Sequence, residues 1–157
     1  MGVGIRPATL EDIPALRAFL YAWDNGAYTA LADKYLRLFE ARGDVQPQFL
    51  IAEKEGILVA SACVTEELFQ PNTWGISWVR VEDSLQGNGI GAEMVEASLD
   101  KIRKSMDGDK TTVLLGTFPG KSRLYEKFGF QKAAEDHIGG TMMYLVLPKE
   151  KVVEHGR

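Results

Sequence analysis

Residues 86–92 read Gln86-Gly87-Asn88-Gly89-Ile90-Gly91-Ala92, between a strand-like segment, 74–81, and a long amphipathic helix pattern that starts near Gly89. Glycine has no Cβ, so this short loop can turn sharply and its backbone can come close to a ligand. The helix that follows directs its unpaired N–H groups and the positive end of its dipole to the same point. The stretch therefore predicts a loop that binds an anion, and the usual anion is a pyrophosphate.

Two known phosphate-binding patterns fit parts of this chain. Residues 87–92 match the dinucleotide fingerprint G-x-G-x-x-A, but the next strand, 111–115, is followed by Gly116-Thr117 and not by an acidic residue for the ribose. This ending argues against a nicotinamide or flavin site. Residues 116–122 look like a P-loop, but three residues separate the glycines where the pattern needs four. A turn before a helix is the favoured interpretation of this second segment.

A third pattern extends over most of the chain. The motif Gln86-x-x-Gly89-x-Gly91 matches the Q/R-x-x-G-x-G/A signature of the GNAT superfamily of N-acetyltransferases, which bind acetyl-CoA. Residues 124–130, LYEKFGF, resemble the family segment that carries the catalytic tyrosine, and residues 5–13 resemble its first strand and helix start. These matches stand at well-separated places in the right order. The chain therefore resembles a GNAT enzyme, with acetyl-CoA as the implied cofactor.

Hydrophobic periodicity and turn residues predict the secondary structure. The expected strands are 3–7, 48–54, 57–67, 73–82, 111–116, 130–136 and 141–147, and the expected helices are one capped by Thr9, then 27–41, 90–106 and 120–128. Asp12 takes the capping-box position of the first helix. In the second helix the side chains expected to face inward are Leu31, Tyr35, Leu38 and Phe39. The order predicts the α/β (α+β) class, with a mixed, mostly antiparallel central sheet of about seven strands and helices on both faces. This arrangement matches the GNAT fold.

Composition favours a soluble globular protein. The 157 residues suit one N-acetyltransferase domain with a short charged tail at 148–157. No apolar run approaches a membrane span and no leader pattern opens the chain, so a cytoplasmic location is the default expectation. The lone cysteine, Cys63, is expected to pack as a small hydrophobe. The net charge of −4 mildly favours cationic substrates and argues against nucleic-acid binding. His137 and His155 lack metal-ligand spacing, so no metal is expected.

Acetyl transfer needs an amine that attacks the thioester carbonyl and a proton donor for the leaving thiolate. By resemblance, Tyr125 is the general acid; the ordinary pKa of tyrosine, about 10, lies above that of a thiol, about 8.5, so the side chain is protonated when needed. Without the resemblance, simple packing of Tyr125 beside Phe128 and Phe130 would be favoured. The resemblance also implies that the main chain of Val79 and Val81 binds the oxyanion and the pantetheine arm.

The general base is harder to assign. Many family members carry a carboxylate in the middle of the fourth strand, but residues 74–78 read Trp-Gly-Ile-Ser-Trp. The nearest acidic residues are Glu66, Glu67, Glu82 and Asp83, and each is expected to be a solvated charge. Glu66 and Glu82 remain weak candidates, together with a water chain that ends at Ser77.

The first two helices, their loop and the last hairpin select the acceptor in this family. Trp23, Asp24 and Tyr28 are weak substrate candidates in that region. Aromatic residues interleaved with acids suit an amine with an apolar body, either a small molecule or a peptide, but they would equally serve a homodimer interface or the core. Because the fourth-strand carboxylate is missing, a non-catalytic acyl-CoA-binding sensor or scaffold of the same fold is kept as the alternative.

Overall fold

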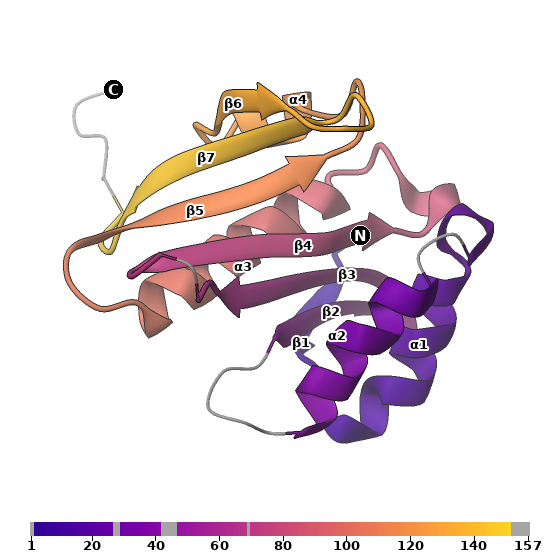
Figure 1. Ribbon diagram of the computed structural model, residues 1–157. Helices are drawn as coiled ribbons and strands as arrows, with labels where there is room; N and C mark the ends of the chain where they lie inside the picture. Colours follow the sequence, from indigo (N-terminus) through magenta and orange to yellow (C-terminus); the bar gives the residue numbers. More distant parts are fainter. Residues whose placement is uncertain (1, 27–28, 42–46, 69, 152–157) are drawn as a thin grey trace.

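The computed structural model describes residues 2–26, 29–41, 47–68 and 70–151 (Figure 1). Its strands are β1 (Gly4–Pro7), β2 (Gln48–Lys54), β3 (Ile57–Glu66), β4 (Thr73–Val81), β5 (Lys110–Thr117), β6 (Gln131–Glu135) and β7 (Thr141–Pro148). They form a seven-stranded sheet in the order β1-β2-β3-β4-β5-β7-β6. The β4–β5 pair is parallel, and the other neighbouring strands of the sheet are antiparallel. The predicted mixed, mostly antiparallel sheet is confirmed.

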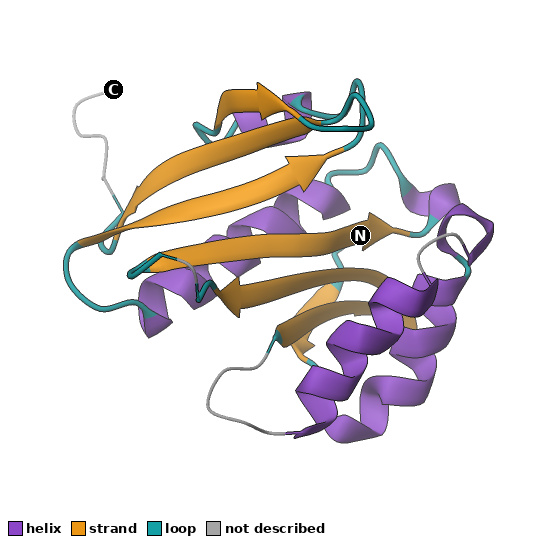
Figure 2. Cartoon of the chain, in the orientation of Figure 1, coloured by secondary structure: helices purple, strands orange, loops and turns teal. Residues whose placement is uncertain are grey.

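Helices cover the two faces of the sheet unequally. They are α1 (Ile13–Tyr21), α2 (Thr29–Ala41), α3 (Ile90–Ser105) and α4 (Arg123–Glu126), with short 3-10 turns η1 (Leu10–Asp12), η2 (Trp23–Gly26) and η3 (Asp83–Leu85). The α1–α2 pair lies against one face of the β1–β4 half, and α3 crosses the opposite face (Figure 2). On the α1–α2 side, the β5–β7–β6 half carries no helix among the described residues.

Strands β2 and β3 are buried on both faces, which explains their nearly continuous apolar sequences. Phe49 and Ile51 pack on the α1–α2 side, whereas Leu50 and Ala52 alternate with them and pack toward α3. Cys63 of β3 is fully buried, and burial raises the pKa of its thiol to about 12. The prediction that this cysteine packs as a small hydrophobe is confirmed.

The start of the first helical segment is tied to the edge strand. The Asp12 carboxylate accepts hydrogen bonds from the Thr9 N–H at 2.7 Å and from the Arg6 guanidinium at 2.8 Å. These bonds, the arginine contacts first, hold the pKa of Asp12 far below its usual range. The capping role predicted for Asp12 is confirmed.

Two details of the predicted helices are wrong. Leu31 and Leu38 are each 47% exposed, because α2 turns the neighbouring stripe, Ala32, Leu36 and Phe39, toward the core. The helix expected over 120–128 is confined to Arg123–Glu126. Gly120 takes a left-handed conformation with φ of 75°, which keeps the chain in a turn until Ser122.

The first residues after β7 contact helix α3 through Lys151. The Lys151 ammonium lies 2.6 Å from a Glu96 carboxylate oxygen and 3.3 Å from one of Asp100. The rest of the predicted tail, 152–157 with His155, lies outside the described residues. Within the described ranges, no helix is long and apolar enough to cross a membrane.

Candidate functional site

The parallel strands β4 and β5 pair along only part of their length. Their pairing runs from Thr73–Thr112 to Gly75–Leu114 and stops there, although both strands continue. Figure 1 shows the two strands diverging toward the right. Residues of both strands line a cleft of about 490 Å³. The cleft reaches from this opening to the N-terminus of α3.

A β-bulge shapes the wall of the cleft on β4. Trp78 and Val79 together face one residue of β3, and Trp78 has a left-handed φ of 53°. The buried Ser61 hydroxyl donates a 2.8 Å hydrogen bond to the Trp78 carbonyl. Farther along, Glu82 donates its N–H to Val59 of β3. Main-chain groups alternate along a regular strand, so the N–H and C=O of Val81, next to Glu82, are directed to the opposite edge of β4. Val79 and Val81 both line the cleft.

The glycine loop leads into the N-terminus of α3 through two left-handed residues. Gly87 and Gly89 have φ of 83° and 82°, and a Cβ on either would meet nothing within 4 Å, so it is the left-handed backbone that requires glycine. The Asn88 amide donates to the Leu85 carbonyl at 3.0 Å, and the Gln86 amide donates to Val81 of β4 at 3.2 Å. The first N–H bonded within α3 is that of Glu93, so the preceding N–H groups of the turn are available to a ligand.

The charges in the cleft are of one sign. Lys121 and Lys127 line it, as does the buried Arg80, and no carboxylate does so in the described part of the chain. Arg80 donates to the Phe19 carbonyl at 2.7 Å near the C-terminal end of α1, and its guanidinium lies 4.1 Å from the Phe19 ring centre. A cleft of this kind attracts an anion although the whole chain is acidic.

Tyr125 of α4 lies at the wall of the cleft. Its side chain is 8% exposed and its ring meets Phe130 edge to face, with 6.1 Å between the centres. Burial raises the pKa of Tyr125 to about 12. The hydroxyl makes no hydrogen bond to any described residue. Tyr125 therefore packs against the core and lines the cleft at the same time.

Most of the residues predicted from sequence meet in this cleft. Those that line it are Trp23, Ser77, Val79, Val81, Gln86, Gly87, Gly89, Ile90, Gly91, Ala92 and Tyr125. Asn88 stands just outside and braces the loop. Glu66 is exposed at the end of β3, and Glu82 lines neither cavity described here. The side chain of Asp24 and all of Tyr28 lie outside the described residues.

A second, smaller cavity of about 240 Å³ adjoins the cleft, and sequence reasoning missed it. Ile76, Ser77 and Gly116 line both spaces. Glu67, expected to be a solvated charge, is half-buried in its wall beside Tyr35. The available sequence signal was Gly75, because a glycine inside a strand indicates close approach of another group. No cluster of three or more His, Cys, Asp or Glu side chains suited to a metal occurs in the described part.

Comparison with known proteins agrees with this architecture. Residues 15–130 match the model of the acetyltransferase (GNAT) family. The Salmonella typhimurium acetyltransferase YncA, solved with its cofactor acetyl-CoA, is 21% identical with a TM-score of 0.74, covering 99% of this chain and 100% of that one. The Escherichia coli GNAT N-acetyltransferase YhbS, solved with CoA, is 18% identical with a TM-score of 0.70, covering 92% and 81%.

A ribosomal-protein-alanine N-acetyltransferase from Brucella melitensis is 22% identical, with a TM-score of 0.67 over 92% of this chain and 99% of that one. Comparison with curated protein sequences finds no match. The structural likenesses establish the fold, and the family model covers well over half of the sequence. The chain belongs to the acetyltransferase (GNAT) family.

Proposed function

We propose that this protein transfers the acetyl group of acetyl-CoA to a primary amine by direct attack within a ternary complex. The observation that carries the proposal is the shape of the cleft, which joins an anion-binding loop to the free edge of β4 and to Tyr125. Two relatives of the same fold were solved with acetyl-CoA or CoA, which supports this donor.

The residues of the cleft fit the parts of acetyl-CoA in order. The N–H groups of residues 87–92 would hold the pyrophosphate, and Lys121 and Lys127 would add positive charge for the phosphates. The main-chain groups of Val79 and Val81 would bind the amide groups of the pantetheine arm. This leaves the thioester at the opening between β4 and β5, beside Tyr125.

The chemistry then follows from the surroundings of the thioester. The amine nitrogen bonds to the acetyl carbon, main-chain N–H groups of β4 stabilise the oxyanion, and the C–S bond breaks. The neutral amine loses one proton after it attacks, to the thiolate or to the solvent, and the product amide keeps one N–H, so the products are an amide and free CoA. Tyr125, kept protonated by burial, donates a hydrogen bond to the departing sulfur.

A thiol-release assay with acetyl-CoA tests this function on a panel of polyamines, amino acids, aminoglycosides, alkylamines and peptide N-termini. The proposal expects amine-dependent release of CoA with formation of the matching amide. A protein that binds acetyl-CoA tightly, acetylates no amine and changes conformation on binding would be the sensor instead.

A further inference from the structure

The smaller cavity lies beside the β4–β5 opening, and its lining includes none of residues 86–92 of the glycine loop. It is bounded by Tyr35 of α2, the end of β3, and Met142 of β7. Met142 is 50% exposed there. Because Ile76, Ser77 and Gly116 also line the cleft, a molecule in this cavity would meet the proposed thioester.

Glu67 is the one charged residue in the described lining of this cavity. A Cβ on Gly75 would overlap its carboxylate oxygen, so the carboxylate lies directly over the β4 backbone. The carboxylate has no hydrogen bond or ion pair with any described residue. Its negative charge contributes to the raised pKa of Tyr35, whose main cause is burial. The cavity therefore presents a half-buried anion that lacks a counter-ion among the described residues.

The rest of the wall is mostly apolar. Ile76, Leu115, Met142 and Met143 are among the apolar residues that line the space, and the polar additions include residues with hydroxyls, such as Thr65 and Ser77. Such a wall favours a ligand that combines a single positive charge with an apolar body, because a second charge would be desolvated without a partner.

We propose that this cavity is the acceptor site and that it selects a small primary amine with one ammonium group and an apolar body, with Glu67 as the counter-ion. The proposal rests on the acetyl transfer inferred above. The two spaces then have opposite charge, cationic for the CoA phosphates and anionic for the amine.

Hexylamine and 1,6-diaminohexane form a matched substrate pair, because both have six carbons and only the second carries an amino group at the far end. With saturating acetyl-CoA, we expect kcat/KM to be at least about tenfold higher for hexylamine. Between ethylamine and hexylamine, kcat/KM should rise up to about fourfold for each methylene that the apolar wall buries. The peptide Leu-Ala-Ala-Ala tests whether the acceptor amine is a peptide N-terminus. We expect its kcat/KM to be lower than that of hexylamine.

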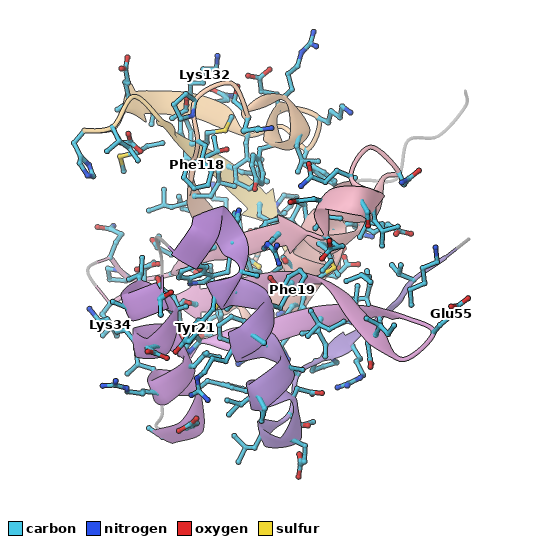
Figure 3. All side chains as sticks on the ribbon, turned by 90° about the vertical axis from the view of Figure 1, so that its right-hand side faces the viewer. Phe19, Tyr21, Lys34, Glu55, Phe118 and Lys132 are labelled. Atoms are coloured by element: carbon cyan, nitrogen blue, oxygen red, sulfur yellow. The ribbon has the colours of Figure 1, made fainter. Side chains whose placement is uncertain are left out.

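Two variants remove the counter-ion in different ways. Glu67→Gln keeps the shape, and it should raise the KM for hexylamine roughly 10- to 100-fold with a smaller change in kcat. Gly75→Ala places a methyl group where the carboxylate lies and should shift KM in the same direction. Glu55→Gln makes the same charge change at a distant hairpin tip (Figure 3) and should leave KM unchanged.

The outcomes separate this inference from the proposed function. Acetylation of diamines or aminoglycosides in preference to hexylamine, or an unchanged KM in Glu67→Gln, would overturn the acceptor site while acetyl transfer stands. If Glu66→Gln raises the KM for hexylamine and Glu67→Gln does not, the counter-ion is the exposed neighbour Glu66 and not Glu67. If no amine is acetylated and acetyl-CoA does not bind, the proposed function itself fails.

Discussion

Replacing Tyr125 with phenylalanine removes one hydroxyl and keeps the ring that packs on Phe130. The hydroxyl has no hydrogen-bond partner among the described residues, so the free energy of unfolding should change by less than about 0.5 kcal/mol. The loop that would hold the pyrophosphate is also untouched, and the affinity for acetyl-CoA should be kept. The expected effect is confined to turnover.

Its size follows from the raised pKa of Tyr125. With this pKa at about 12 and that of a thiol near 8.5, complete proton transfer to the thiolate would be uphill by about 5 kcal/mol. We therefore expect Tyr125 to act as a hydrogen-bond donor to the charged sulfur, which contributes about 1.5–3 kcal/mol. The kcat of Tyr125→Phe should fall roughly 10- to 150-fold. General acid catalysis typically contributes about 10²–10⁴-fold, so the decrease expected here overlaps only the lower end of that range.

The assay is steady-state thiol release between pH 6 and pH 11 with a working acceptor. In the wild type, no falling limb should occur below about pH 10, because Tyr125 is still protonated there. Tyr144→Phe is the matched control, since it removes a hydroxyl that bonds to Gln131 on the surface, and its kcat should be unchanged. A kcat of Tyr125→Phe within twofold of wild type would refute the donor role.

Other parts of the account predict further effects. Gly89→Val should weaken acetyl-CoA binding at least about tenfold, whereas Gly56→Val, equally left-handed but at a hairpin tip, should not change it. Ser61→Ala leaves the carbonyl at the bulge without its buried partner and should destabilise the fold by about 1–3 kcal/mol in urea titrations. Because the pKa of Asp12 is lowered by folding, the extra stability of the wild type over Asp12→Asn should be complete above about pH 4 and shrink at lower pH; a pH-independent difference would contradict this.

Local patterns predicted those parts of the protein that depend on neighbours in sequence. The Gln86–Ala92 loop, the capping role of Asp12 and the apolar stripe of α3 all follow from residues a few positions apart. The family pattern added the placement of Tyr125, which local spacing alone would have assigned to the core. The structure brings that residue and the loop to one cleft.

The features that sequence reasoning missed depend on tertiary contacts. Helix α2 carries two apolar stripes, and its packing on α1 and the sheet decides that Leu36 is buried and Leu38 is exposed. The bulge at Trp78 depends on Ser61, a partner in another strand. From sequence, Glu67 is interpreted as a solvated charge at the end of a strand. Only the tertiary structure shows that its carboxylate lies against Gly75 of β4.

The central claim, that the cleft between β4 and β5 is an acetyl-CoA site, is tested most directly by calorimetric titration of the full chain. Acetyl-CoA should bind with one-to-one stoichiometry, and NAD should bind far more weakly or not at all. Tight binding of NAD without binding of acetyl-CoA would contradict the account.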